Sequence, residues 1–563
     1  MNKMHDSKGK KYNVIIYNPD EFRGDALNNT LLHPNSKIKT VTPNFDKLAS
    51  EGVTFKNCHT AHTVCTQSRT SFMTGWYTHV YGKRTLWNML DENEPNLLKS
   101  FLREGYNVQW WGKNDLLAPN AFPVSVTNAT SNGSAMKNMK PLFNFDTDPG
   151  KYMSFLFQTQ GDEMKHQTSD YQNVQAACNF LKTHRRNNKN NNGNDIDDAT
   201  KPFLLYLPLF YPHPPYTCPE PFYSMFDKDK DIAPLRKLKE CRNKPDFYHL
   251  IRKYRYLEEI EDEDELLKQI RSVYLGACAY SDYCFGELMK GLKESGHEDD
   301  TIVVVFSDHG DWAGDYGLVE KWPSGLDNVL THVPLIVKTP PGCTSFQAKG
   351  HVVEELVQLF DIVPTLYELN SIDNEASQYV HFGKSLSAQL NGNSGDLQRH
   401  IYAEGGFSTN EPKTFEGQSL PPEHPLYFNH IGGNKTNIYG PKGQQQQDNP
   451  LSVCRAVMVR NLKYKLVLRS DPSLINNDGS TINHSCELYD YRNDPFELKN
   501  IYGDKDYRDV QNQLEKHLLT WFLNTSDVTK GNEDPRQLPY AAKALEKRRL
   551  KLIEKRARVT SRL

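Results

Sequence analysis

The sequence predicts an α/β fold, with a large mixed, mainly parallel sheet sandwiched by helices and a smaller C-terminal α+β subdomain carrying an antiparallel sheet. Two observations support this prediction. Short runs of β-branched and aromatic residues alternate with longer helix-like segments along most of the chain, which is typical of a parallel sheet with helices on both faces. After about residue 450, short strand-like runs follow one another and are separated by polar turns, which favours antiparallel pairing.

The elements follow in order from the N-terminus. Residues 12–17 are a short β-branched run, as expected for a buried strand, and residues 301–306 repeat the pattern. Further strands are expected at 107–111, 203–207 and 335–337, and helices at 44–52, 96–104, 170–184 and 263–295. The first of these helices has Thr42-Pro43 as its start signal and Gly52 as its stop signal.

We divide the chain into three parts. A large domain is expected at residues 12–445, with an Asn-rich surface insertion near residues 185–198. A C-terminal subdomain is expected at residues 446–530, with strands at 456–459, 464–468 and 487–491. Residues 531–563 are expected to form a basic helical tail, because lysine and arginine recur through a helix-like pattern there.

Composition excludes several classes of protein. Lys plus Arg is 67 and Asp plus Glu is 70, so the net charge is 67 − 70 = −3. A protein that binds nucleic acid through bulk charge would need a clear basic excess. Apolar stretches are far shorter than the ~18 residues that span a bilayer. We therefore expect no nucleic-acid partner and no membrane span.

Targeting signals and cysteines indicate an intracellular protein. Residues 1–11 are polar and show no apolar segment before a cleavage site, so a cytoplasmic location is expected. The C-terminal tripeptide Ser561-Arg562-Leu563 resembles a peroxisomal address, which makes that organelle an alternative. Ten cysteines in 563 residues, with no CxxC pair, indicate reduced thiols and not a disulfide framework.

Acidic clusters follow two of the predicted strands. Asp20 and Glu21 come soon after the first strand, and Asp308 and His309 follow the strand at 301–306. Ligands of open α/β sheets sit outside the carboxyl ends of the strands. The two clusters are therefore expected to converge on one site, although nearly 290 residues separate them. Helix N-caps are the alternative role for Asp20 and Asp308.

The strongest local motif is Cys65-Thr-Gln-Ser-Arg69. It lies on a segment that enters a predicted helix, and a helix N-terminus supplies N–H donors and a positive dipole that favour an anion. Arg69 adds a fixed cation against that anion. From composition alone, a buried structural cysteine is the alternative.

Cys65-x-x-Ser68-Arg69 with Met73-Thr74-Gly75 resembles the signature of the formylglycine-dependent sulfatases, in the alkaline phosphatase superfamily. Further matches follow in the family's order at residues 13–25, 42–52, 112–113, 212–213, 307–311, 317–321, 333–336 and 487–497. The resemblance spans roughly residues 12–525. It implies an arylsulfatase-like sulfuric ester hydrolase that acts on a small-molecule or carbohydrate sulfate ester.

The resemblance also implies a nucleophile and a metal site. A formylglycine-generating enzyme would oxidise Cys65 to formylglycine, and the hydrated aldehyde would attack sulfur. One divalent ion would be held by Asp20, Glu21, Cys65, Asp308 and His309. Ca²⁺ fits this oxygen-rich set best, and Mg²⁺ or Mn²⁺ are alternatives. His309 stands where many family members have Asn, which extends the choice to Mn²⁺ or Zn²⁺.

The remaining catalytic residues are assigned by family position. Arg69, Lys113 and Lys321 would neutralise charge around the sulfuryl group as the bridging oxygen leaves. His213 is the candidate general acid for the leaving oxygen, and a structural histidine in a proline-rich loop is the alternative. Asp115 would act as a base on the remaining hydroxyl, or would instead cap the loop that follows it.

The sequence departs from the family pattern at two positions. Gln67 stands where most members have Pro or Ala, in the segment that the modifying enzyme reads. Asp115 stands where the family has His. Three functions are therefore weighed: a metal-dependent sulfatase, a phosphodiesterase or phosphonate monoester hydrolase on the same site, and a non-catalytic binding protein in which Cys65 remains a thiol.

Overall fold

The structure is a computed structural model. It describes residues 10–27, 40–131, 156–184, 201–254, 257–260, 262–345, 348–372, 379–408, 411, 449–470 and 485–526. The predicted Asn-rich insertion and the predicted basic tail, with its C-terminal tripeptide, lie outside these residues.

A large sheet of eight strands forms the centre of the molecule, in the order β4-β3-β5-β1-β6-β7-β2-β8. Every neighbouring pair is parallel except those made by β7, which runs antiparallel to β6 and to β2. The predicted mixed, mainly parallel sheet is therefore confirmed. The strands are β1 Asn13–Asp20, β2 Val53–His59, β3 Asn107–Trp111, β4 Asn128–Thr130, β5 Phe203–Pro212, β6 Thr301–Phe306, β7 Leu335–Lys338 and β8 His351–Gln358.

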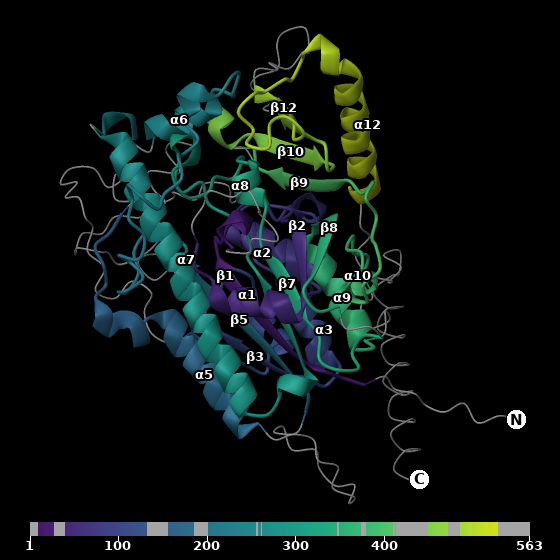
Figure 1. Cartoon of the computed structure of the whole chain (residues 1–563). Coiled ribbons are helices and arrows are strands. Elements are labelled where there is room, and N and C mark those ends of the chain that lie inside the picture. The colour runs from purple at the N-terminus through teal and green to yellow at the C-terminus, as the bar shows by residue number, and fades with distance from the viewer. Residues whose placement is uncertain are drawn as a thin grey trace, which may run out of the picture.

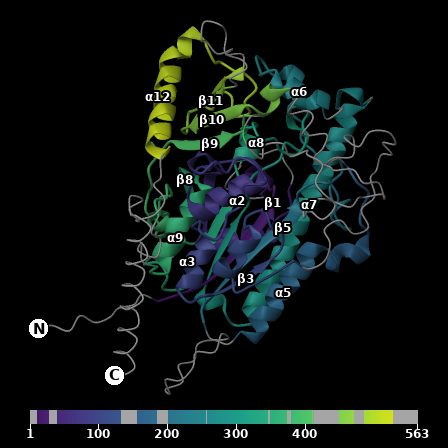
Figure 2. The same ribbon diagram turned by 180° about the vertical axis from the view of Figure 1, so that it is seen from behind.

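Helices cover both faces of this sheet (Figures 1 and 2). The alternation along β1 shows why: Val14 and Ile16 lie in one core cluster, whereas Ile15 and Tyr17 lie in the other. The first cluster includes α2 Cys65–Thr74, α3 Leu97–Arg103 and α9 Ile362–Leu369; the second includes α1 Pro43–Glu51, α5 Ser169–Thr183 and α7 Glu263–Glu294. The other helices are α4 Phe122–Ser125, α6 Phe247–Tyr254, α8 Asn328–Thr331, α10 Ser387–Leu390 and α12 Arg508–Thr525.

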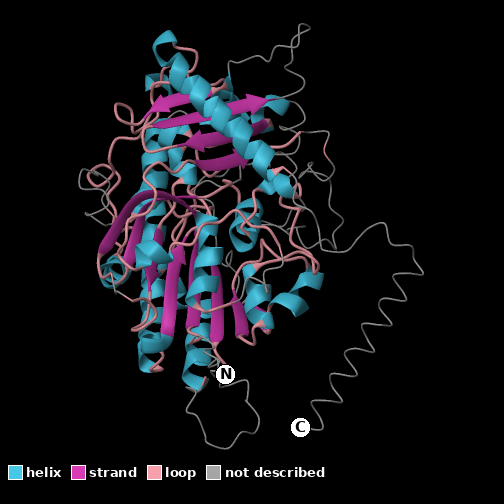
Figure 3. Ribbon diagram, turned by 90° about the vertical axis from the view of Figure 1, so that its right-hand side faces the viewer, coloured by secondary structure: helices cyan, strands magenta, loops and turns pink. Residues whose placement is uncertain are grey.

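A second, smaller sheet lies above the first (Figure 3). It is antiparallel throughout, in the order β12-β11-β10-β9, as predicted for the C-terminal part. Its strands are β9 Ile401–Gly405, β10 Arg455–Arg460, β11 Tyr464–Ser470 and β12 Glu487–Asp490, and α12 runs beside it. β9 lies before residue 446, so one strand of the small sheet comes from the part of the chain that we assigned to the large domain. The domain boundary at residue 446 stays a prediction.

Two further features of the described residues concern the hydrophobicity of the helices and the state of the cysteines. Among the helices of the described ranges, none is both long enough and apolar enough to cross a membrane. All ten cysteines are free thiols, and eight of them, including Cys65, are buried.

Candidate active site

The candidate site lies at the carboxyl ends of four adjacent strands, β3, β5, β1 and β6. Asp20 ends β1, Lys113 follows β3, His213 follows β5, and Asp308 follows β6. Gly112 permits the close approach behind Lys113, because a Cβ there would lie 2.1 Å from the Pro208 carbonyl oxygen. The two acidic clusters thus meet, as their places at strand ends predicted.

Cys65 is the first residue of α2 and is 4% exposed. Its Sγ lies 3.3 Å from His309 Nε2 and 3.6 Å from Asp20 Oδ1. No side chain caps this helix at Val64. The positive end of the α2 dipole therefore faces the site, where an anion would be favoured.

Arg69 joins the two acidic strand ends. Its Nε donates to Asp308 Oδ2 at 2.9 Å, its Nη2 donates to Asp20 Oδ2 at 3.0 Å, and all three side chains are fully buried. Lys113 Nζ adds a third contact, 2.6 Å from Asp20 Oδ2. Burial alone would raise the pKa of Asp20, but Lys113 and Arg69 together hold it well below its usual range. Asp20 is therefore a charged carboxylate at neutral pH.

His309 presents a lone pair to the same point. Its Nδ1 donates to the Gly310 carbonyl oxygen at 2.9 Å, so in the neutral ring the lone pair is on Nε2, which faces Cys65. Asp20, Cys65, Asp308 and His309 each offer one ligand atom, and these atoms lie within 4.8 Å of one another. Two carboxylates and an imidazole nitrogen fit a divalent cation.

Glu21 lies beside this group and not within it. It belongs to a second cluster with Asp20 and His213. Its Oε2 accepts from Lys321 Nζ at 2.7 Å. Its other oxygen, Oε1, is buried and has no hydrogen-bond partner among the described residues, so it remains available to a ligand. The metal role of Glu21 stays a prediction.

His213 and Lys321 form a close pair. Lys321 Nζ donates to His213 Nε2 at 2.6 Å, while His213 Nδ1 donates to the Pro214 carbonyl oxygen at 2.6 Å. Burial, together with the charges of Lys321 and Lys113, lowers the pKa of His213 well below its ordinary value. His213 is therefore neutral in the free protein, and the proton between the two side chains is on Lys321.

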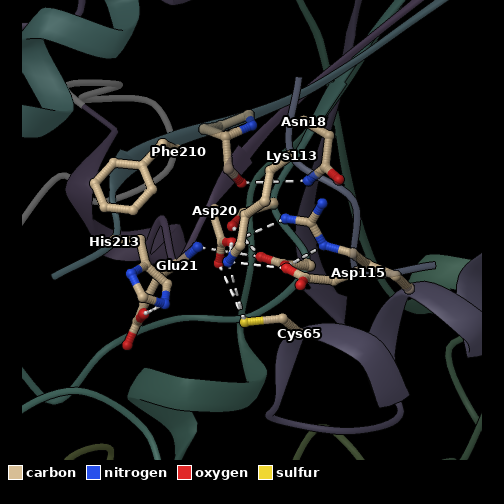
Figure 4. Close-up of polar contacts among 12 residues, drawn as sticks. Asn18, Asp20, Glu21, Cys65, Lys113, Asp115, Phe210 and His213 are labelled. Atoms are coloured by element: carbon tan, nitrogen blue, oxygen red, sulfur yellow. Dashed lines mark hydrogen bonds and ion pairs between the residues drawn. The ribbon is translucent and has the colours of Figure 1, made fainter. Parts of the chain in front are cut away.

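Figure 4 shows how these side chains surround Asp20: Lys113 and Cys65 lie close to it, and Asp115 and the His213–Glu21 pair lie on opposite sides. Asp115 Oδ2 is 2.9 Å from Lys113 Nζ. The loop that follows is capped by Asn114, whose Oδ1 accepts from the N–H groups of Leu116 and Leu117. The capping alternative for Asp115 is therefore taken by its neighbour, and its role as a base stays a prediction.

A family model named Sulfatase matches residues 20–372, more than half of the chain. The chain belongs to the sulfatase family. The match begins at Asp20 and takes in Cys65, His309 and Lys321, so it covers both halves of the site just described.

The chain is also similar to curated relatives and, in its fold, to solved structures. The multifunctional alkaline phosphatase superfamily protein PehA of Trinickia caryophylli is 24% identical, over 92% of this chain and 96% of its own. An arylsulfatase of Clostridium perfringens is 27% identical, over 70% of this chain and 82% of its own. The phosphonate monoester hydrolase of Agrobacterium radiobacter has the same fold, with a TM-score of 0.64 at 21% identity, over 92% of this chain and 96% of that one.

Gln67, the departure from the family signature, is only half satisfied in the interior, because its Oε1 is buried without a hydrogen-bond partner among the described residues. The side chain is fully buried, and its Nε2 donates to the Arg84 carbonyl oxygen at 2.8 Å. No hydrogen bond joins this side chain to Cys65. Burial, and after it the charge of Asp20, raises the pKa of the Cys65 thiol to about 12. Without modification, Cys65 is therefore a protonated thiol at neutral pH, which is a poor nucleophile.

Sequence reasoning missed several supporting residues. Ser307 Oγ accepts from the Phe22 N–H at 2.8 Å and donates to the His309 carbonyl oxygen at 2.9 Å, which ties the two acidic loops together. Its place directly before Asp308 was the signal available. Tyr274, in the middle of α7, bridges the backbone of Glu21 and Arg23 through its hydroxyl, and no local pattern marks it.

Proposed function

We propose that the chain is a metal-dependent sulfatase that hydrolyses a sulfate ester of a small molecule or carbohydrate through formylglycine derived from Cys65. One observation carries the proposal. Cys65 stands at the N-terminus of α2 beside two buried carboxylates and the imidazole Nε2 of His309, with Arg69 and Lys113 paired to the same Asp20. This arrangement suits a cation and a tetrahedral anion in one place.

The residues of the chain divide the work of binding. Asp20, Asp308 and His309 would hold the metal, which would polarise a sulfate oxygen as a Lewis acid. Hydrated formylglycine would supply the hydroxyl that attacks sulfur. Arg69 and Lys113, together with Lys321, would stabilise the charge that grows on the sulfuryl oxygens and the leaving oxygen, because they are already fixed by their ion pairs.

Proton transfer would fall to two sites. On the leaving-group side, the hydrogen-bonded Lys321–His213 pair would deliver a proton to the departing oxygen. On the opposite side, Asp115 would take the proton from the second hydroxyl of the hydrated aldehyde, so that the sulfated intermediate releases sulfate. Asp115 is about one-sixth exposed, at 16%, which keeps it open to solvent for proton exchange.

Mass spectrometry of the protein from its native host tests the nucleophile. Conversion replaces the sulfur and two hydrogens of Cys65 by one oxygen, so the tryptic peptide changes mass by a known amount. A converted peptide, together with hydrolysis of 4-nitrophenyl sulfate that is lost in Cys65→Ala, is the expected result. A peptide with cysteine only, or full turnover by Cys65→Ala, rules out the covalent mechanism. Cysteine only, without turnover, is the result that a binding protein on this fold would give.

Hydrolysis of a phosphodiester or phosphonate ester is the second candidate. It is favoured by the shared fold with a phosphonate monoester hydrolase over 92% of the chain. Sulfate and phosphonate esters share tetrahedral geometry, so the same cations could bind either one. The retention of both Lys113 and Lys321 supports sulfate. Comparing kcat/KM for 4-nitrophenyl sulfate with that for a phenylphosphonate ester, with and without added metal, decides between them.

A further inference from the structure

The hydroxyl of Tyr216 connects two loops that build the site. It donates to both oxygens of Asp311, at 2.9 and 3.0 Å, and it accepts from the Glu320 N–H at 2.8 Å. Tyr216 lies three residues after His213, and Glu320 immediately precedes Lys321. Tyr216 is 1% exposed, so these bonds are shielded from water. The Tyr216 side chain thus links the loops that carry His213 and Lys321, and anchors them to the loop that carries Asp308 and His309.

The loop segments that it joins are held in unusual backbone conformations. Glu320 has φ 60° and Ala313 has φ 42°, in the left-handed region that residues with a Cβ rarely adopt. Asp311 Oδ1 accepts from the Ala313 N–H at 2.6 Å, and the Trp312 N–H donates to the Glu320 carbonyl oxygen at 3.0 Å. Such conformations persist only where surrounding bonds fix them. The Tyr216 hydroxyl bonds directly to the backbone of Glu320 and to the carboxylate that fixes Ala313.

We propose that Tyr216 is a positioning residue for the leaving-group side of the site, and that its hydroxyl sets the contact between Lys321 Nζ and His213 Nε2. This inference rests on the proposed function of that pair. Phenylalanine at position 216 would leave the Glu320 N–H and the Asp311 carboxylate without their shared partner. Glu320 would then be free to leave its left-handed conformation, and Lys321 would move away from His213.

The experiment compares Tyr216→Phe with Tyr211→Phe. Tyr211 is also fully buried, belongs to the same stretch of chain, and donates one hydrogen bond, to Gln160. In Tyr216→Phe, kcat/KM for an alkyl sulfate should fall about tenfold, and that for 4-nitrophenyl sulfate about twofold, because only the poor leaving group needs the proton. Tyr211→Phe should lower both by the same small factor. A crystal structure of each variant gives the distance between Lys321 and His213.

The outcomes separate this inference from the function on which it rests. Equal losses on both substrates, with the 2.6 Å contact kept in Tyr216→Phe, overturn the role of Tyr216. A wild-type protein that hydrolyses no sulfate ester overturns the proposed function, and the crystal structures then decide the positioning role alone. If Tyr216→Phe does not fold at the assay temperature, Asp311→Asn replaces it. This change removes one of the two oxygens that accept from Tyr216, so the same dependence on leaving group is expected, and its absence overturns the proposal.

Discussion

Two halves of the candidate site are held in different ways. The ion-pair half consists of Asp20, Cys65, Arg69, Lys113 and Asp308, and each of its charged groups is fixed by another charged group. Asp20, Lys113 and Asp308 lie at the carboxyl ends of β1, β3 and β6, Cys65 begins α2, and Arg69 lies one turn further along that helix. Arg69 donates to both Asp20 and Asp308, two carboxylates that would otherwise repel one another.

The loop half consists of Glu21, His213 and Lys321, and it depends on backbone geometry. Glu21 has φ 68°, and Glu320, beside Lys321, has φ 60°. Its side chains pair with one another, but buried tyrosines hold the loops that carry them. The comparison indicates that the ion-pair half fails when charge is removed, whereas the loop half fails when neutral hydrogen bonds are removed.

Replacing Arg69 should produce the largest effect. Arg69→Ala leaves Asp20 and Asp308 buried, adjacent and without a shared cation, which should cost about 3–5 kcal/mol in the free energy of unfolding. Turnover should fall about a thousandfold, since a fixed donor to the transition state is lost. Chemical denaturation and kcat/KM for 4-nitrophenyl sulfate measure the two effects.

Arg69→Lys is the matched control, because it keeps the positive charge and loses the planar guanidinium group with its two separate donors. A single ammonium group cannot place two donors on two carboxylates. It should therefore recover part of the stability and little of the turnover. Full turnover in Arg69→Lys would show that charge alone, without geometry, holds this half.

The loop half should respond next, and with a different signature. Lys321→Ala and His213→Ala should each lower kcat/KM for an alkyl sulfate by about a hundredfold, because both groups serve the departing oxygen. The loss on 4-nitrophenyl sulfate should be smaller. In the double variant the losses should not add, since the two side chains act as one pair. Additive losses that are independent of the leaving group would contradict this reading of the pair.

The same contrast explains what the sequence could predict. Asp20 and Asp308 follow strands whose patterns are local, so periodicity predicts that they meet, and the family resemblance adds Arg69 and Lys113 to the same site. The contact of Lys321 with His213 depends on a hydrogen bond from Glu320 to Tyr216, 104 residues away in the chain. No local pattern encodes such a bond. The strands β2, β4, β8 and β9 escaped prediction for a related reason, because mixed polar and apolar runs such as β8 form strands only against their neighbours.

The pH dependence of the free energy of unfolding tests whether Asp170 supports the loop that carries His213. The Asp170 carboxylate accepts from the N–H groups of Phe210 and Tyr211, just before His213. Burial, against the effect of these bonds, raises the pKa of Asp170 to about 6. A folded pKa above the unfolded value of 3.8 stabilises the fold below about pH 4, and this contribution is lost as pH rises through about 6. The wild type should lose about 2 kcal/mol over this interval from Asp170 alone.

Asp170→Asn should remove that part of the pH dependence, and it should also lower turnover about threefold, because one of the two N–H groups loses its acceptor and the His213 loop loosens. Asp282→Asn is the control. Asp282 accepts from the N–H groups of Asn44 and Phe45 at the start of α1, and burial raises its pKa to about 7. It should flatten the stability curve at a higher pH without a change in turnover. Equal turnover in Asp170→Asn and Asp282→Asn would show that Asp170 does not support the His213 loop.

The smallest effect is expected on the conversion of Cys65 to formylglycine, which precedes catalysis in the ion-pair half. Gln67→Ala removes one hydrogen bond, from Gln67 Nε2 to the Arg84 carbonyl oxygen, and should cost about 1 kcal/mol of stability. If, as the proposed function requires, a formylglycine-generating enzyme reads this segment, an Ala there, where most family members have Ala or Pro, should raise the fraction of Cys65 converted to formylglycine. Thr66→Ala is the control, since the Thr66 hydroxyl makes no hydrogen bond within the described ranges. Quantitative mass spectrometry of the peptide measures conversion in each variant. The contrary result is complete conversion of Cys65 in the wild type and the same conversion in Gln67→Ala. It would mean that the modifying enzyme does not recognise Gln67, and that this side chain serves only to pack beneath the ion-pair half.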